Sequence, residues 1–178
     1  MKISFQRVSD ETGLALVRRL ADAIWPETFA PILSAPQIPY MMDMMYAPAV
    51  LARELASGVR WEIVLVDASP AGYLSWSACP DRPETAKLHK VYLSSRWHGL
   101  GLGQAMLDHA ADCCRSEGFR HVLLAVNKRN DHAIRAYRRN GFAIVESVCN
   151  DIGGGFVMDD FLMARDLSRS PAPSPSAS

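Results

Sequence analysis

The segment from His98 to Gln104 reads H-G-L-G-L-G-Q and is the stretch of this sequence best suited to binding chemistry. Gly99, Gly101 and Gly103 lack a Cβ atom, so the backbone can turn tightly and direct several N–H groups toward one point. An alternating strand pattern precedes the segment, and an amphipathic helix pattern begins within it. Because a helix N-terminus presents unpaired N–H donors and a positive dipole end, the spacing predicts a phosphate or pyrophosphate site. A plain strand-to-helix turn is the structural alternative.

Two common glycine signatures do not fit this segment. A Rossmann fingerprint needs a glycine at its sixth position, where this sequence has Gln104 or Met106, depending on the register. A P-loop needs a lysine followed by serine or threonine, and no lysine follows these glycines. The preceding strands also favour an antiparallel meander over a βαβ unit. The anion predicted here is therefore neither a Rossmann dinucleotide nor a P-loop nucleotide.

The surrounding periodicity predicts one α/β (α+β) domain. The first helix is capped by Asp10 or Thr12, and Pro26 is expected to end it. Further helices are expected after Pro39, over 48–57, from the glycine segment to Gly118, and from Asn130 or Asp131 to Gly141. Strands are predicted over 3–8, 61–66, 71–77, 87–93, 122–126, 142–146 and 156–163. In the fourth strand, strict alternation places Leu88, Lys90 and Tyr92 on one face and His89, Val91 and Leu93 on the other.

Composition narrows the possible partners. The chain has 178 residues, with 19 Lys plus Arg and 19 Asp plus Glu, so no overall charge favours nucleic acid. No stretch approaches transmembrane length and no signal peptide is evident, so a cytoplasmic protein with no membrane partner is expected. The four cysteines form no C-x-x-C pair and have no His cluster beside them in sequence, so we expect no metal site. We expect a domain over 1–167 and a disordered Ser/Pro-rich tail over 168–178.

Three separated motifs together resemble the GNAT superfamily of N-acetyltransferases. They are L-H-K-V-Y-L (88–93), H-G-L-G-L-G (98–103) and V-N-K-R-N-D-H-A-I-R-A-Y-R-R-N-G-F (126–142), in the family's order and on matching predicted elements. The resemblance implies a mixed, strongly twisted central sheet of about seven strands flanked by helices. It also implies a V-shaped splay between strands 4 and 5, with acetyl-CoA in the cleft. His98 takes the position where the family usually has Gln or Arg; a shift by two residues would place Arg96 there instead.

The resemblance assigns expected cofactor-binding residues. The family pairs the pantetheine arm with the backbone of the splayed strand and holds the pyrophosphate on the glycine loop, and a residue matching Asn130 contacts the arm in many members. Carried onto this chain, the expected set is Val91, Tyr92, Leu93, His98, Gly99, Leu100, Gly101, Leu102, Gly103, Gln104 and Asn130. A bare helix cap is the structural alternative for Asn130.

Acetyl transfer to an amine needs an unprotonated amine, a polarised carbonyl and a proton for the departing thiolate. Tyr137 matches the tyrosine that donates this proton in much of the family, and an ordinary tyrosine, with a pKa of about 10, is protonated at neutral pH. Its structural alternative is a buried tyrosine whose hydroxyl only satisfies a backbone group. A strand N–H near Val91 or Leu93 can polarise the carbonyl. The candidates for the general base are His89, Glu84, Glu62, Asp151 and a water chain, with His89 favoured because its ordinary pKa lies near neutrality.

Segments near residue 25, at 88–93 and at 151–163 resemble a bacterial subgroup that includes spermidine/spermine acetyltransferases. The expected acceptor is therefore a small primary amine or a polyamine, which Glu27, Asp43 and Asp151 can attract. Three alternatives remain: a catalytically silent acyl-CoA-binding sensor, a protein or peptide N-acetyltransferase, and a structural protein with an incidental glycine turn. Homodimers are frequent in the family, so a second copy of the chain is a possible partner.

Overall fold

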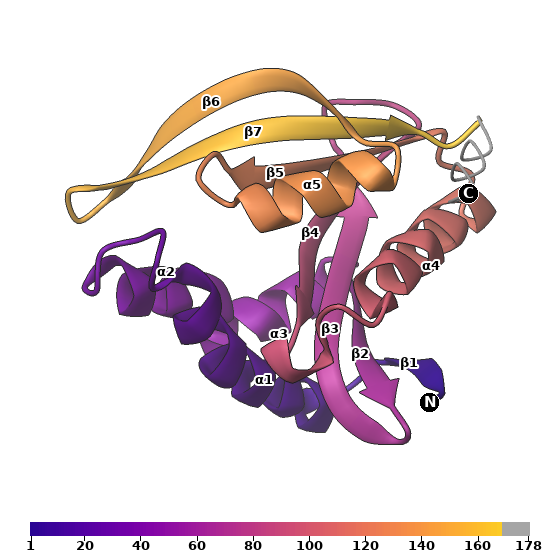
Figure 1. Cartoon of the computed structure of the whole chain (residues 1–178), viewed down its shortest axis with the longest axis horizontal. Helices are drawn as coiled ribbons and strands as arrows, with labels where there is room; N and C mark the ends of the chain where they lie inside the picture. The colour runs from indigo at the N-terminus through magenta and orange to yellow at the C-terminus, as the bar shows by residue number, and fades with distance from the viewer. Residues whose placement is uncertain (169–178) are drawn as a thin grey trace.

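The centre of the structure is a twisted seven-stranded sheet with helices on both faces (Figure 1). The computed structural model describes residues 1–168, so the predicted tail from residue 169 onward lies outside the described residues. The strands are β1 (Ile3–Arg7), β2 (Arg60–Val66), β3 (Ser69–Ala78), β4 (Thr85–Leu93), β5 (His121–Asn127), β6 (Ala143–Gly153) and β7 (Phe156–Asp166). The helices are α1 (Glu11–Phe29), α2 (Gln37–Tyr46), α3 (Pro48–Ala56), the short 3₁₀ helix η1 (Ser95–Trp97), α4 (Leu102–Ser116) and α5 (Asp131–Arg139).

The strands lie in the order β1-β2-β3-β4-β5-β7-β6, and the β4–β5 pair is the parallel one. That pairing runs from Thr85 opposite His121 to Leu88 opposite Leu124 and does not continue beyond Leu88. From there β4 pairs only with β3, and β5 continues to pair with β7. The two halves of the sheet therefore diverge, which confirms the mixed sheet with a splay between its fourth and fifth strands.

Each face of the sheet has its own core. One cluster packs α4 and α5 against the sheet around Met106, Ile134 and Met163. The other packs α1, α2 and α3 against the opposite face around Trp25 and Tyr46. In this second cluster the Trp25 Nε1–H and the Tyr73 hydroxyl both donate to the Tyr46 hydroxyl, at 3.0 Å and 2.8 Å. The buried Trp61 Nε1 has no hydrogen-bond partner among the described residues. The two cores fix the helices that wall the splayed region on both sides.

The prediction that Pro26 ends the first helix is wrong, because α1 continues to Phe29. Proline lacks an N–H, so one helical hydrogen bond is lost at this position. The turn continues because Trp25 and Phe29 are buried on the face that packs against the sheet, and the Ala30 N–H donates to the Pro26 carbonyl at 3.0 Å. Burial of two large aromatic side chains outweighs one missing hydrogen bond.

The predicted alternation along the fourth strand is also wrong. Lys90 pairs with Ser75 and Leu88 pairs with Trp76, so His89 is an extra residue in a β-bulge. After the bulge the side-chain phase changes. Leu88 now shares its core with Val91 and Leu93, while Tyr92 packs into the opposite core. The bulge thus turns Lys90 and Tyr92 toward α1 and α2.

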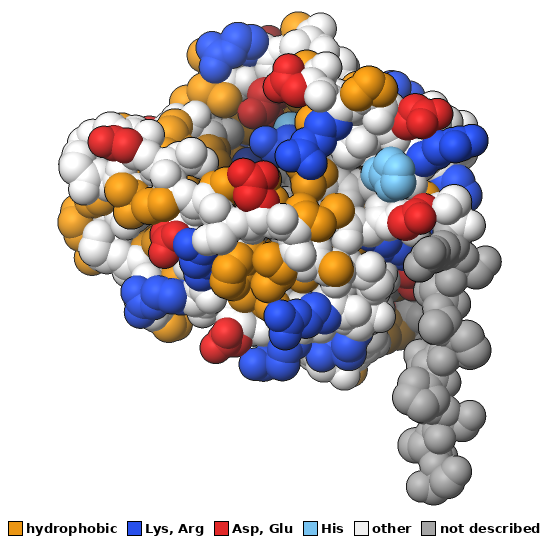
Figure 2. Space-filling view, turned by 90° about the horizontal axis from the view of Figure 1, so that it is seen from above, with side chains coloured by type: hydrophobic (Ala, Val, Ile, Leu, Met, Phe, Trp, Pro, Cys, Tyr) orange, Lys and Arg blue, Asp and Glu red, His pale blue; other side chains and the backbone are white. Residues whose placement is uncertain are grey.

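The last two strands are longer than predicted, since β6 alone runs from Ala143 to Gly153. Most of its side chains are exposed on this edge strand, so its sequence carries little hydrophobic alternation. The molecular face in Figure 2 carries basic and acidic side chains interspersed with apolar ones. Within residues 1–168, no helix combines the length and the apolar character needed to cross a bilayer.

Substitution of Gly72 on β3 tests how closely β3 packs against β4, the strand that borders the splay. A Cβ atom at this position would lie 2.2 Å from the Tyr92 carbonyl oxygen, which is backbone and cannot move aside easily. We expect Gly72→Ala to lower the free energy of unfolding by about 1–3 kcal/mol, measured by urea denaturation. Gly103→Ala is the matched control, because the added Cβ meets no atom within 4 Å and alanine favours the helix. Equal stability of the two variants would contradict this packing.

Candidate active site

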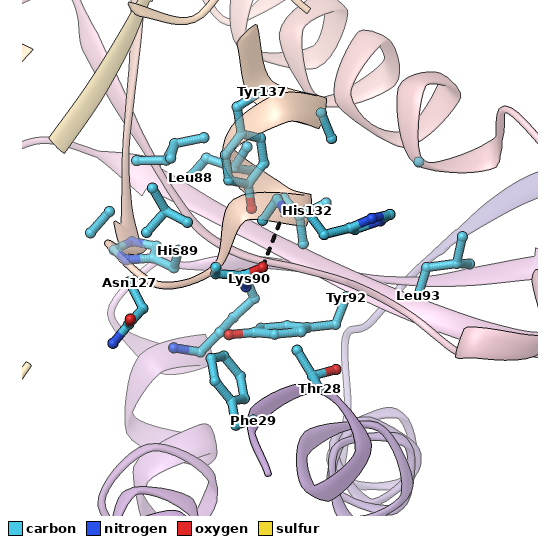
Figure 3. A pocket seen from close by; sticks show the side chains of 18 of the residues that line it. Thr28, Phe29, Leu88, His89, Lys90, Tyr92, Leu93, Asn127, His132 and Tyr137 are labelled. Atoms are coloured by element: carbon cyan, nitrogen blue, oxygen red, sulfur yellow. Dashed lines mark hydrogen bonds between the residues drawn. The ribbon is translucent and has the colours of Figure 1, made fainter. Parts of the chain in front are cut away.

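The divergence of β4 and β5 opens a cleft of about 630 Å³. Its walls come from α1 and α2 on one side, from the start of α4 and from α5 on the other, and from β7. Figure 3 shows Tyr137 on α5 directed toward Lys90 and Tyr92 on β4, with Thr28 and Phe29 of α1 beyond them. The lining is largely apolar and aromatic, with few charged groups, as in sites that bind a small molecule.

The glycine segment forms the mouth of this cleft and starts α4. Gly99 and Gly101 have φ angles of +76° and +77°, a left-handed conformation that favours glycine. Gly101 is the N-cap and makes no side-chain cap hydrogen bond, and no atom lies within 4 Å of a Cβ built on Gly103. An exposed helix N-terminus with an open backbone cradle fits an anionic phosphate group.

The predicted segment divides into two groups in the structure. His98, Gly99, Gly101, Gly103 and Gln104 line the cleft. The two leucines of the segment do not line it: Leu100 is exposed, and Leu102 is buried beside Val66 and Ala71.

Gln104 and His98 brace the cradle from its two ends. The Gln104 amide donates to the Ala136 carbonyl of α5 at 3.0 Å, which ties the two helices together. His98 Nε2 lies 2.9 Å from the Leu93 carbonyl, and the His98 ring stacks on His132 with centroids 5.4 Å apart. Burial, and then the positive charges around it, lower the pKa of His132.

The structure separates the two candidate residues for the family's Gln/Arg position. His98 lines the cleft, whereas the Arg96 guanidinium packs over the Trp97 ring at 5.2 Å and does not line it. Of the two registers, the one that puts His98 at the Gln/Arg position therefore has a side chain that lines the cleft beside the glycine cradle.

Val91, Tyr92 and Leu93 form one wall of the cleft. They follow the last residue of β4 that pairs with β5, so the edge of β4 that faces β5 has no sheet partner here. Asn130 lies across the cleft, where its Oδ1 accepts the Ala133 N–H at 3.2 Å and caps α5. An unpaired strand edge can accept the amide groups of an extended ligand.

The Tyr137 ring packs 5.9 Å from Phe142 and lines the cleft. Among the described residues no group hydrogen-bonds its hydroxyl, which does not support a tyrosine that only satisfies the backbone. Burial raises the pKa of Tyr137 to about 12, so this hydroxyl is protonated across the physiological range.

His89 occupies the bulge and lines the cleft, with Nε2 2.7 Å from the Ser77 hydroxyl. Burial, followed by the charges of Lys90 and Lys87, lowers the pKa of His89 to about 4. The imidazole is therefore neutral at pH 7 and a weak base.

The other predicted side-chain bases do not line the cleft. Glu62 bonds His109 at 2.6 Å, and Glu62, His109 and Cys113 form a cluster whose potential ligand atoms lie within 4.8 Å of one another. The sequence prediction considered no such grouping, because β2 and α4 bring it together. Asp151 accepts the Gly153 N–H at 2.8 Å at the tip of the β6–β7 hairpin, and Glu84 lies in an exposed loop.

The acidic residues predicted to attract a polyamine are also absent from the lining. Glu27 accepts a hydrogen bond from Ser95 at 2.6 Å, and Asp43 is exposed on α2. The charged side chains that do line the cleft include Lys90 and Asp160, which the sequence prediction missed. The available signals were a lysine inside an apolar strand and an acid two residues after Met158, on the same face of its strand. The surroundings of these two faces depend on the bulge and on the strand pairing.

Comparison with known proteins gives a consistent family assignment. The profile of the acetyltransferase (GNAT) family matches residues 17–142. Streptothricin acetyltransferase of Streptomyces lavendulae is 37% identical over 79 residues, which cover 43% of this chain and 40% of that protein. Other curated relatives are matched over 38% and 25% of their length, so the chain spans less than half of these relatives.

Solved structures share the fold at low identity. The PaiA N-acetyltransferase of Thermoplasma acidophilum, solved with coenzyme A, superposes with a TM-score of 0.77 at 21% identity, covering 93% of this chain and 99% of that one. The protein YncA of Salmonella typhimurium, solved with its cofactor acetyl-CoA, gives a TM-score of 0.64 at 17% identity, covering 98% and 99%. With the family profile matching residues 17–142, this chain belongs to the GNAT family of acetyltransferases.

Proposed function

We propose that this protein transfers the acetyl group of acetyl-CoA to the nitrogen of a small primary amine, by direct attack of the amine. The observation that carries the proposal is the juxtaposition of three features in one cleft. These are an open glycine cradle at a helix N-terminus, an unpaired strand edge, and a protonated tyrosine hydroxyl that no described residue hydrogen-bonds. Each feature serves a different part of one reaction.

Acetyl-CoA supplies an activated thioester when it is bound. The cradle from Gly99 to Gly103 is suited to its pyrophosphate, and the β4 edge from Val91 to Leu93 to its amide-containing arm. In the proposed reaction a backbone N–H of this edge polarises the thioester carbonyl. Tyr137 donates its proton to the departing sulfur.

The charges in the cleft favour a compact amine over a polyamine. Glu27, Asp43 and Asp151 do not line the cleft, and Asp160 is a carboxylate that does. A polyamine with several cationic centres needs several carboxylates, and Lys90 adds a positive charge to the lining. The subgroup resemblance keeps spermidine among the amines to be tested.

The first experiment is a calorimetric titration with acetyl-CoA, followed on the same sample by thiol release with a panel of amines that includes spermidine. We expect acetyl-CoA to bind, and we expect thiol release to be faster with compact amines than with spermidine. Binding without release on any amine would favour an acyl-CoA sensor or a peptide acceptor. Absence of binding would overturn the proposed function.

Tyr137→Phe tests the general acid. Removal of the hydroxyl should lower kcat by about 10²-fold or more, the usual effect of losing a general acid, while the affinity for acetyl-CoA and the melting temperature stay the same. Because the Tyr137 pKa is about 12, ionisation of this hydroxyl should not limit the wild-type rate up to pH 10. An unchanged kcat in Tyr137→Phe would remove Tyr137 from the mechanism.

Gly101→Ala tests the cradle, with Gly58→Ala as a matched control. Both glycines have positive φ angles, +77° and +94°, and open space around an added Cβ, so both variants bear a similar backbone cost of about 1 kcal/mol. Only Gly101 lines the cleft. We expect Gly101→Ala to weaken coenzyme A binding roughly ten-fold by calorimetry and Gly58→Ala to leave it unchanged. Equal affinities in the two variants would argue against the cradle.

A further inference from the structure

Asp160 is a buried residue whose carboxylate has no hydrogen-bond or ion-pair partner within residues 1–168. It is 5% exposed and lines the cleft from β7. Lys128 pairs with the neighbouring Asp159, and its charge acts on Asp160 only through space. Burial, followed by the Asp159 charge, raises the pKa of Asp160. Desolvating a carboxylate without compensation is costly, so a site that keeps one is suited to a cationic ligand.

Lys90 presents the opposite charge in the same cleft. Its ammonium approaches the Met45 sulfur at 3.6 Å and lies 5.4 Å above the Tyr46 ring, and within residues 1–168 it makes no ion pair. Glu54 on α3 acts on it through space without contact. The aromatic ring compensates only part of the desolvation of an ammonium. An anionic ligand group would supply the missing partner.

The two charges face one chamber and yet do not pair with each other. The Tyr92 ring packs in the aromatic cluster that also holds Tyr46, whose ring lies beside the Lys90 ammonium. Burial raises the pKa of Tyr92, and the charge of Asp160 adds to that rise. Figure 3 shows Lys90 and Tyr92 on β4 opposite Tyr137. Asp160, Lys90 and Tyr137 therefore line the same cleft.

We propose that Asp160 and Lys90 are the two poles of the acceptor site, so that the acceptor is a small zwitterion: an amine that also carries a carboxylate or similar anion. The inference rests on the proposed acetyl transfer and names its substrate class. Asp160 receives the ammonium group and Lys90 receives the anion. The apolar walls contributed by Trp25, Phe29 and Met41 accommodate an apolar side chain between them.

This placement also accounts for the protons. The ammonium gives one proton to the Asp160 carboxylate, and the freed lone pair forms the bond to the thioester carbonyl carbon. The carbon–sulfur bond breaks, the sulfur takes the Tyr137 proton, and Tyr137 recovers a proton from the acetylated nitrogen. Asp160 returns its proton to water, so the net products are the amide, the free thiol and one proton.

The test compares amines that differ only in the anionic group. One series is leucine, leucinamide and isoamylamine, and a second, with a longer spacing, is 6-aminohexanoate and hexylamine. We expect kcat/KM for the carboxylate-bearing member of at least one series to exceed that of its uncharged partners roughly 10- to 100-fold. Equal or higher kcat/KM for the uncharged amines in both series would overturn the proposal.

Variants of Lys90 and Asp160 test which residue causes the preference for carboxylate-bearing amines. Lys90→Met keeps the length of the side chain and should bring kcat/KM for the carboxylate-bearing amines down to that of their uncharged partners. Lys2→Met, which changes the net charge equally and lies outside the cleft, should leave the preference intact. Asp160→Asn should lower kcat/KM for every amine in both series. A preference that persists in Lys90→Met would contradict the role of Lys90.

A binding measurement separates this inference from the proposed function. Calorimetry of the same acceptor series on the coenzyme A complex needs no turnover. Tighter binding of the carboxylate-bearing members, lost in Lys90→Met, supports the acceptor class even where no acetyl transfer occurs. Binding that ignores the carboxylate overturns the inference even where acetyl transfer to amines is observed.

Discussion

The pairing of β4 with β5 for only four residues is the constraint on which the candidate site depends. In a continuous sheet the edges of both strands would be satisfied by each other, and the space between them would be core. Here β3 and β7 hold the two strands from their outer edges, so each remains ordered while the inner edges diverge. The glycine cradle follows the end of β4, and Asn130 follows the end of β5. Every local feature of the cleft takes its position from that separation.

The bulge at His89 decides which β4 side chains point into the cleft. One extra residue in β4 reverses the side-chain phase, so Lys90 and Tyr92 face α1 and α2. Without it, strict alternation would place Leu88 on the same face as Lys90 and Tyr92. The splay and the bulge therefore have separate effects on β4. The splay leaves the backbone edge of β4 unpaired along the cleft, and the bulge directs the Lys90 and Tyr92 side chains into the cleft from the side of α1 and α2.

The distinction between local patterns and strand pairing explains which parts of the molecule could be predicted from sequence. The individual helices and strands and the glycine segment depend on local patterns, namely glycine spacing, helix caps and periodicity, and these can be seen within short windows. The splayed mixed sheet and the expected role of Tyr137 come instead from the resemblance of three motifs to the GNAT superfamily. Asp160 and Lys90 acquire meaning only through strand pairing and a bulge, which depend on contacts far apart in the sequence. The prediction for the end of α1 is wrong for a related reason, because tertiary burial of Trp25 and Phe29 outweighs the local effect of Pro26.

Backbone features and side-chain charges contribute differently to the specificity of such a cleft. A cradle of backbone N–H groups and a strand edge recognise a ligand through geometry that many sequences can build, so they carry little information about the second substrate. Unpaired side-chain charges carry that information, because each one penalises every ligand that fails to neutralise it. We therefore propose that unpaired charges in the cleft select the acceptor. Among the described residues, Asp160 and Lys90 line the cleft without an ion pair, and their opposite signs are the physical reason to look for an acceptor that carries both charges.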